Sequence, residues 1–257
     1  MGGESCGLAF VSSGSPASEE ALAELVERYG NSSVETSEAI VALGGDGFVL
    51  QCLHQYLDLG KPIYGMNRGT IGFLMNEYRL EGLPERIAAA HQEVLHPLRM
   101  RAETTDGSIH EALAFNEVSV LRTSRQSANL SILVDGQSQL EKLICDGVLV
   151  ATPAGSTAYN LSVHGPVIPL GADLMALTAI SAFRPRRWRG ALLPHTASVT
   201  INNLDAEKRP ISAAADQTEV EDVVSLTVSQ ASDEFVTMLF DDGHSLNERI
   251  LREQFAI

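Results

Sequence analysis

Short apolar runs alternate with amphipathic stretches over the first 70 residues of the chain. The apolar runs predict strands at 7–12, 40–43 and 63–66. Alternation of strands and helices within so short a stretch predicts an α/β fold with a parallel sheet and right-handed crossovers. The two intervening stretches have apolar residues at helical spacing, namely Leu22, Leu25, Val26 and Tyr29 in the first and Leu50, Leu53 and Leu57 in the second.

Beyond residue 90 the helical spacing gives way to short β-prone segments. The pairs Asp106-Gly107 and Asp135-Gly136 lie between such segments and predict hairpin turns. Evenly spaced strands with little helix are typical of an antiparallel sandwich, which we expect as a second domain. The predicted strands are 94–105, 109–115, 117–122, 130–134, 140–144, 147–151, 197–203, 223–228 and 235–240, and helices are predicted at 84–90 and 245–255.

The boundary between the two domains is predicted near His96 and Pro97. No linker rich in Pro, Gly and Ser marks it, so we expect the domains to pack together with a cleft between them. With 257 residues, of which 44% are hydrophobic, the chain can bury a sizeable core, which excludes a disordered protein.

Acidic residues outnumber basic ones by 33 to 18, giving a formal net charge of −15. This balance argues against a partner that needs a broad basic surface, and we therefore expect no binding to nucleic acid. Only Lys61, Lys142 and Lys208 are lysines, so no polybasic membrane patch is available either. A small anion held by backbone amides is compatible with the acidic charge.

The three cysteines, Cys6, Cys52 and Cys145, lie far apart in the sequence. They predict neither a disulfide framework nor a zinc site. The most apolar window, 174–183, is too short and too rich in Thr and Ser to span a bilayer. The first residues lack the basic flank and long apolar stretch of a signal peptide, so we expect a cytoplasmic protein.

A glycine-rich turn, Gly44-Gly45-Asp46-Gly47, follows the second predicted strand. Glycines at the start of a helix expose backbone N–H groups and let a phosphate approach closely. A carboxylate among them suits a metal ion or a base for a hydroxyl nucleophile. The alternative is a tight turn in which Asp46 caps the helix.

A second such turn, 67–74, follows the third predicted strand and contains Gly69 and Gly72. Ligands of open parallel sheets bind at the carboxyl ends of strands, so both turns would face one crevice. The alternative is that these glycines only allow the loop to turn.

Two further segments have the chemistry of a nucleotide site. In 146–162, small and hydroxyl residues would let a planar base lie close to the backbone. The alternative is a helix start capped by Ser156 or Thr157, which would need only one hydroxyl. In Asn116-Glu117, an amide and a carboxylate could bind a base edge and ribose hydroxyls, or form an ordinary strand-edge pair.

Several common motifs are absent from the sequence. It has no GxxxxGK[ST] loop, no protein-kinase motif set, no GxGxxG after a strand, no HExxH and no GxSxG. The dense basic run at 184–189 predicts an exposed loop or interface element with Trp188 packed beneath it. Alternatively, this run could contact substrate phosphates or an acidic surface on another subunit.

Taken together and in order, these segments resemble the NAD kinase family. The resemblance is carried by GGDG, NxGxxGFL, the Asn-Glu pair and DGxxxxTPxGSTAYxxS, which span Gly44 to Pro166 at about the family's separations. GGDG alone also occurs in lipid kinases and phosphofructokinases, whereas the combination is specific.

The resemblance implies a Rossmann-like α/β domain packed on an antiparallel β-sandwich, with the C-terminal segment returning to the first domain. The implied domains are 1–96 with about 231–257, and 97–230. The implied activity is ATP-dependent phosphorylation of the 2′-hydroxyl of the adenosine ribose of NAD, giving NADP, with Mg²⁺ or another divalent cation. A homodimer or homotetramer is also implied. The alternatives are a non-catalytic NAD(P)-binding sensor, or a lipid or sugar kinase that shares only GGDG.

The resemblance also implies roles for individual residues. Asp46 would be the general base or hold the metal, Asn116 and Glu117 would hold the adenosine part of NAD, and Asp146 would reach the nicotinamide end. Three positions depart from the family pattern: Phe48 replaces Thr after GGDG, His164 replaces Gly, and Gln217 replaces Gly after Asp216. The other implied binding residues are Gly44, Gly45, Gly47, Asn67, Gly69, Phe73, Ala154, Thr157, Ala158, Tyr159, Asn160, Leu161, Ser162 and Asp216.

Overall fold

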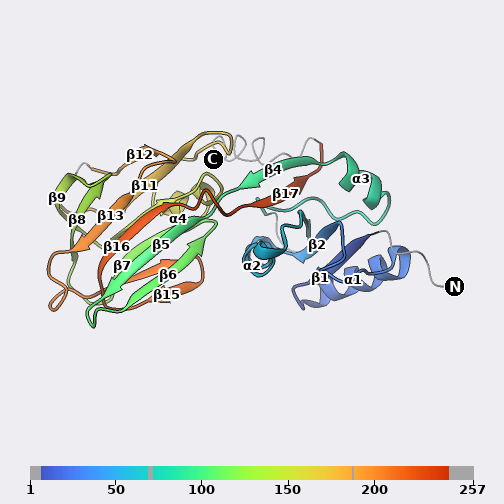
Figure 1. The fold of residues 1–257 in the computed structure, drawn as a ribbon, viewed down its shortest axis with the longest axis horizontal. Helices are drawn as coiled ribbons and strands as arrows, with labels where there is room; N and C mark the ends of the chain where they lie inside the picture. Colours follow the sequence, from blue (N-terminus) through green and yellow to red (C-terminus); the bar gives the residue numbers. More distant parts are fainter. Residues whose placement is uncertain (1–6, 69–71, 187, 243–257) are drawn as a thin grey trace. The chain divides into compact units, whose positions relative to one another are not determined.

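A computed structural model describes residues 7–68, 72–186 and 188–242, which fall into two compact units (Figure 1). The first unit runs to Leu95 and resumes at Glu234, whereas the second is His96–Asp233. No helix in these described ranges is long and apolar enough to cross a membrane. The helix predicted at 245–255 lies outside the described residues.

The first unit is built on a five-stranded sheet in the order β1-β2-β3-β17-β4. Neighbouring strands from β1 to β17 are parallel, and β4 is antiparallel to β17. Because β17 lies between β3 and β4, the later part of the chain completes this sheet, which confirms the expected return. The strands are β1 Leu8–Ser12, β2 Ala39–Gly44, β3 Ile63–Asn67, β4 His91–Leu95 and β17 Val236–Phe240.

The helices of this unit follow the predicted pattern except at one point. Helix α1, Pro16–Tyr29, buries Leu25 and packs the rest of its predicted apolar face against the core. Helix α2, Asp46–Gln55, ends before Leu57, which lies in a separate 3-10 turn, η1 Leu57–Leu59. The prediction that Leu57 extends the apolar face of α2 was wrong, because the helix stops at Gln55. Helix α3 is Leu83–Ala89.

The second unit contains two six-stranded antiparallel sheets, ordered β12-β11-β10-β7-β14-β15 and β6-β5-β16-β13-β8-β9. Both sheets contribute to one apolar core, for example Val120 and Val148 from the first and Met100 and Ile201 from the second. The predicted antiparallel sandwich is confirmed. Its strands are β5 Leu98–Thr104, β6 Ile109–Ala114, β7 Glu117–Arg122, β8 Ala128–Val134, β9 Gln137–Cys145, β10 Gly147–Ala151, β11 Leu174–Ile180, β12 Gly190–Pro194, β13 Val199–Asn203, β14 Ile211–Ala215, β15 Thr218–Val220 and β16 Val223–Gln230, and its short helices are η2 Ala154–Thr157 and α4 Tyr159–Ser162.

Two strand predictions for the second unit need correction. The segment 94–105 is not continuous, since it divides at His96-Pro97 between β4 of the first unit and β5 of the second. Strands β11, β12, β14 and β15 were not predicted. Strand β11 is buried along nearly all its length, so it lacks the alternation that marks a half-exposed strand. Both predicted hairpin turns are confirmed, between β5 and β6 and between β8 and β9.

Candidate functional site

The GGDG turn joins a buried strand to a helix in the first unit. Strand β2 is buried throughout and ends at Gly44, and α2 begins at Asp46 with Gly45 as its N-cap residue. The carbonyl of Gly45 accepts the N–H groups of Phe48 and Val49. No side chain caps this helix. The alternative in which Asp46 caps it is therefore wrong.

The Asp46 carboxylate is instead held by the second glycine-rich turn. The N–H of Phe73 donates to Oδ2 at 2.6 Å, and the N–H of Leu74 donates to Oδ1 at 2.9 Å. The two turns also contact each other directly, because the N–H of Arg68 donates to the carbonyl of Gly44 at 2.8 Å. Two charge-assisted bonds fix both carboxylate oxygens at the carboxyl end of β2.

Several predicted residues of the first unit thus come together around Asp46. Asn67 lies opposite Gly44 in the register of β2 and β3, and Phe73 contributes its backbone N–H. Gly45 and Gly47 have open space where a Cβ would stand, which suits the close approach of a ligand. Gly69 lies outside the described residues.

In the second unit, Asp216 organises the Asn116-Glu117 segment. Its Oδ2 accepts the N–H of Phe115 at 2.7 Å, and its Oδ1 accepts the N–H groups of Asn116 at 3.0 Å and Glu117 at 3.3 Å. Asp216 lies in the turn between β14 and β15 and has a φ of 48°. Since the left-handed residue of this turn is Asp216, the turn does not require glycine at Gln217.

Glu117 is the strongly perturbed carboxylic acid of this cluster. Burial and, secondarily, the charge of Asp216 raise its pKa to about 7, whereas the N–H of Tyr159 lowers it. Its Oε2 is buried and has no hydrogen-bond partner among the residues that the structure describes. A buried polar atom without a partner is rare and expensive, so it marks a position suited to a ligand donor.

The loop 152–157 packs against this same segment. Oγ1 of Thr152 donates to the carbonyl of Phe115 at 2.7 Å and accepts the N–H of Gly155 at 2.9 Å. The N–H of Thr152 donates to the carbonyl of Asn116 at 2.9 Å. A Cβ on Gly155 would overlap with that carbonyl and lie 2.6 Å from Asn116 Cα. The absence of a side chain at Gly155 therefore allows the loop to approach the backbone of Asn116.

The hydroxyls of Ser156 and Thr157 do not cap a helix. Oγ of Ser156 donates to the carbonyl of Pro153 at 2.6 Å and accepts the N–H of Ile168 at 2.9 Å. Oγ1 of Thr157 donates to the carbonyl of Ala154 at 3.2 Å. Neither η2 nor α4 has a side-chain cap, so the capping alternative for Ser156 and Thr157 was wrong.

Asn160 differs from the other predicted residues of this segment because its side chain is fully buried. Its Nδ2 donates to the carbonyls of Ser156 and Pro166, at 3.1 and 2.9 Å, and its Oδ1 accepts Oγ1–H of Thr178 at 2.7 Å. These bonds give Asn160 a supporting position within the loop. Ala154, Thr157, Ala158, Tyr159 and Leu161 are partly exposed, and Ser162 is exposed.

Asp146 follows β9 and forms an ion pair with Arg122, with 2.6 Å between Oδ1 and Nε. Sequence reasoning did not identify Arg122, and no spacing in the sequence indicates a pair formed across two strands. It also left Thr152, Leu74 and Gly72 out of the predicted site. These three residues lie within the NxGxxGFL and DGxxxxTPxGSTAYxxS motifs, so the motifs do indicate them.

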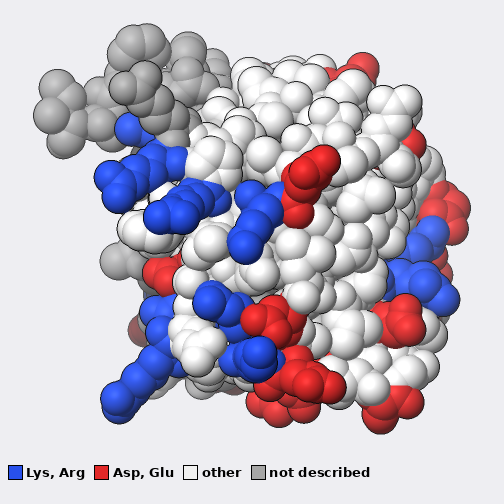
Figure 2. Space-filling view, turned by 90° about the vertical axis from the view of Figure 1, so that its left-hand side faces the viewer, with Lys and Arg blue, Asp and Glu red and all other residues white. Residues whose placement is uncertain are grey.

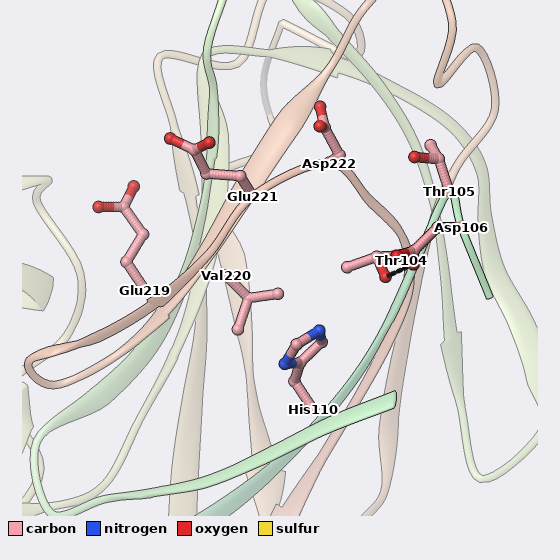
Figure 3. Close-up of a pocket in the computed structure, with 8 residues that line it drawn as sticks. All are labelled: Thr104, Thr105, Asp106, His110, Glu219, Val220, Glu221 and Asp222. Carbon is pink, nitrogen blue, oxygen red and sulfur yellow. Dashed lines mark hydrogen bonds between the residues drawn. The ribbon is translucent and has the colours of Figure 1, made fainter. Parts of the chain in front are cut away.

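A separate cavity of about 460 Å³ lies in the second unit between β5, β6 and the β15–β16 connection (Figure 3). Half of its lining residues are acidic: Asp106, Glu219, Glu221 and Asp222. Oγ1 of Thr104 donates to Asp106 at 2.6 Å, which is the main reason that the pKa of Asp106 falls to about 2. None of the predicted site residues lines this cavity. Its negative charge disfavours a phosphate-bearing ligand.

The basic run at 184–189 is exposed where the structure describes it, apart from Trp188. Its start is attached to β9 through hydrogen bonds between the backbones of Arg184 and Ile144. Trp188 packs against the sandwich core, as expected. Figure 2, which views the end of the second unit near β8 and β9, shows Lys and Arg side chains gathered mainly on one side.

Comparison with known sequences gives consistent matches. A family model described as the ATP-NAD kinase C-terminal domain matches residues 115–238. A Brucella suis biovar 1 protein named NAD kinase is 57% identical over 251 residues, covering 98% of each chain. A Mesorhizobium japonicum protein of the same name is 58% identical over 248 residues, covering 96% of each chain.

Two solved structures share the fold. Yeast NADH kinase complexed with NADH matches with a TM-score of 0.81 and 20% identity, covering 96% of this chain and 86% of that chain. An NAD kinase from Archaeoglobus fulgidus in complex with ATP matches with a TM-score of 0.77 and 22% identity, covering 97% and 99%. Both confirm the expected combination of an α/β unit with an antiparallel β unit.

Proposed function

The chain belongs to the NAD kinase family and phosphorylates NAD to NADP with ATP, and on this premise we propose that Asp46 is the general base of the reaction. The observation that carries the proposal is the fixed carboxylate at the carboxyl end of β2, with one backbone amide bonded to each oxygen. A carboxylate held in one position suits proton abstraction, because the transfer depends on hydrogen-bond geometry.

The reaction adds a phosphoryl group to the 2′-hydroxyl of the adenosine ribose. Asp46 accepts the hydroxyl proton while the hydroxyl oxygen forms a bond to the γ-phosphorus of ATP. The bond from the γ-phosphorus to the oxygen bridging to the β-phosphate breaks, and its electron pair leaves with ADP. General-base assistance typically contributes about 10²–10⁴-fold, and alignment and charge neutralisation contribute most of the rest.

We propose that the Asn116-Glu117 cluster holds the adenosine part of NAD. The unpartnered Oε2 of Glu117 supports this, because a ribose hydroxyl would supply the missing donor. Asp146, paired with Arg122, is proposed to reach the nicotinamide end. The partly exposed residues of 154–162 are proposed to line the pocket, whereas Asn160 and Asp216 hold its backbone in place.

Phosphates are assigned to the glycine-rich turns of the first unit. Gly44, Gly45 and Gly47 would admit phosphate, and Asn67, Gly69 and Phe73 belong to the neighbouring turn of the proposed site. The yeast relative was solved with NADH and the Archaeoglobus fulgidus enzyme with ATP, which supports binding of both ligand classes by this chain.

A divalent cation such as Mg²⁺ is proposed to accompany ATP. No group of three or more His, Cys, Asp or Glu residues within the described ranges is arranged to hold a metal ion. Mg²⁺ that binds with nucleotide usually needs only one or two protein carboxylates besides the phosphates, and Asp46 meets that requirement. When bound, the ion would supply neutralisation of phosphate charge.

Three broader assignments are also proposals. We propose a homodimer or homotetramer, a cytoplasmic location, and domains at 1–96 with about 231–257 and at 97–230. Sedimentation velocity tests the first, fractionation of the native host tests the second, and limited proteolysis tests the third. Cleavage confined to β-strand interiors would contradict the domain boundaries.

The catalytic assignment is tested with Asp46→Asn, which keeps the size of the side chain and removes its basicity. NADP formation should fall while NAD binding, measured by calorimetry, is largely retained. Unchanged NADP formation would show that Asp46 is not the base.

A further inference from the structure

Gly72 is the glycine whose missing side chain bears directly on the Asp46 carboxylate. A Cβ at this position would overlap with Oδ1 and would lie 2.8 Å from Cγ and 3.0 Å from Oδ2. By contrast, a Cβ on Gly45 or Gly47 would meet nothing within 4 Å. The steric requirement for glycine near the carboxylate therefore lies in the second turn.

The backbone that follows Gly72 is held firmly. The N–H of Asn76 donates to the carbonyl of Gly65 at 2.7 Å, and the carbonyl of Asn76 accepts the N–H of Asn67 at 2.9 Å. The fully buried Asn76 side chain donates from Nδ2 to the carbonyl of Leu239 and accepts the N–H of Asp241 at Oδ1, both at 2.9 Å. These bonds attach the segment to β3 and to the end of β17.

Close packing restricts movement of the segment 74–76. Leu74 and Met75 are buried, at 5% and 1% exposure, and the carbonyl of Leu74 approaches Gly65 so closely that a Cβ there would lie 2.8 Å away. The three atoms nearest to a methyl group added to Gly72 all belong to the end of the Asp46 side chain. The Asp46 carboxylate would therefore rotate away, while the backbone of 74–76 would stay in place.

We propose that Gly72 is a positioning residue for phosphoryl transfer. Its lack of a side chain lets the N–H groups of Phe73 and Leu74 close on the carboxylate of Asp46 and fix both oxygens where the proton is taken up. The inference rests on the proposed role of Asp46 as the base. It assigns to Gly72 a task in catalysis that is separate from forming a loop or admitting a phosphate.

The test is Gly72→Ala in the full-length enzyme, assayed for NADP formation with NAD and ATP. We expect kcat to fall by about 100-fold, because a displacement of about 1 Å in a reacting group can cost that much. The KM for NAD should change by less than about twofold, since the substitution removes no ground-state contact with NAD. The midpoint of thermal unfolding should stay within a few degrees of the unmodified enzyme.

Gly171→Ala is the matched control. A Cβ at Gly171 would meet nothing within 4 Å, and this glycine lies in the second unit outside the assigned site residues. Its kinetics and thermal midpoint should equal those of the unmodified enzyme. The control shows what a change from glycine to alanine does without a steric clash. Any further effect of Gly72→Ala then comes from the clash with the Asp46 carboxylate.

A double-mutant cycle with Asp46→Asn distinguishes a positioning role from a merely structural one. If Gly72 acts through Asp46, adding Gly72→Ala to Asp46→Asn should lower kcat by less than about threefold. The proposal is overturned if kcat survives in Gly72→Ala, if the 100-fold loss persists in the double variant, or if folding is lost. Unchanged activity in Asp46→Asn alone would instead refute the proposed base.

Discussion

Two carboxylates, one in each unit, are held in opposite ways. Both oxygens of Asp46 accept a backbone N–H from the neighbouring turn. Glu117, in the second unit, accepts the N–H of Tyr159, and its buried Oε2 has no hydrogen-bond partner among the described residues. Its pKa is raised to about 7. The first arrangement suits the base that we propose, because it holds both oxygens in one position. The second leaves one buried oxygen available for the ligand donor that we propose.

The largest expected effect is at the fixed carboxylate. Asp46→Asn should lower kcat for NADP formation by about 10²–10⁴-fold, the usual contribution of a positioned base. Glu117→Gln, which keeps a hydrogen-bonding side chain, should mainly raise the KM for NAD. Steady-state kinetics on both variants test the contrast. If the two variants changed kcat and KM alike, the two carboxylates would not have different roles.

Two glycines extend the comparison between the units. A Cβ on Gly72 would meet the side chain of Asp46, whereas a Cβ on Gly155 would meet the backbone of Asn116. A Cβ on Gly155 would overlap with the carbonyl of Asn116, which cannot rotate away. Gly155→Ala should therefore destabilise the protein by about 3 kcal/mol, at the upper end of overpacking effects. Denaturant unfolding measures this loss, with Gly171→Ala as the control. A stable Gly155→Ala variant would contradict the close approach of loop 152–157 to Asn116.

The sequence predicted the parts of the site that depend on local spacing. Strand β2, the turn at Gly44 and the start of α2 follow from an apolar run that ends in glycines. The Asn116-Glu117 pair and the loop 152–157 were recognisable because the motifs keep their chemistry and order. Local composition indicates where a turn must form and which groups it exposes.

The interactions that set the roles of those residues could not be predicted. The bonds from Phe73 and Leu74 to Asp46 join residues 27 and 28 positions apart, and Asp216 contacts Phe115 over 101 positions. Such contacts depend on strand order and on register across the sheet. Strand β11 was missed for a related reason, since burial of nearly every residue removes the alternation that would reveal a strand.

The raised pKa of Glu117 predicts a smaller effect that depends on pH. Its pKa is raised from 4.5 to about 7 in the folded protein, so the folded state binds the proton more tightly than the unfolded state. Stability should therefore fall as the pH rises from about 4.5 to 7, and the full cost is present above pH 7. Partial exposure limits this cost to about 1–2 kcal/mol.

Glu117→Gln should remove this pH dependence, because the amide stays neutral at every pH. The variant should be more stable than the unmodified protein above pH 7 and nearly equal to it below pH 4.5. Urea unfolding at a series of pH values measures the difference. A difference that did not change with pH would mean that Glu117 titrates normally in the folded protein.

An effect of similar size concerns the support of loop 154–162. Thr178 on β11 donates to the buried Oδ1 of Asn160 at 2.7 Å, and that oxygen has no access to water. Thr178→Val keeps the shape of the side chain and leaves Oδ1 without this donor, so stability should fall by about 1–2 kcal/mol. Thr200→Val is the control, because the hydroxyl of Thr200 makes a long contact of 3.4 Å with the hydroxyl of Thr227.

Since Asn160 holds the loop that is proposed to line the NAD pocket, Thr178→Val should also raise the KM for NAD while leaving kcat nearly unchanged. A fall in kcat would instead connect this loop to the positioning of the base.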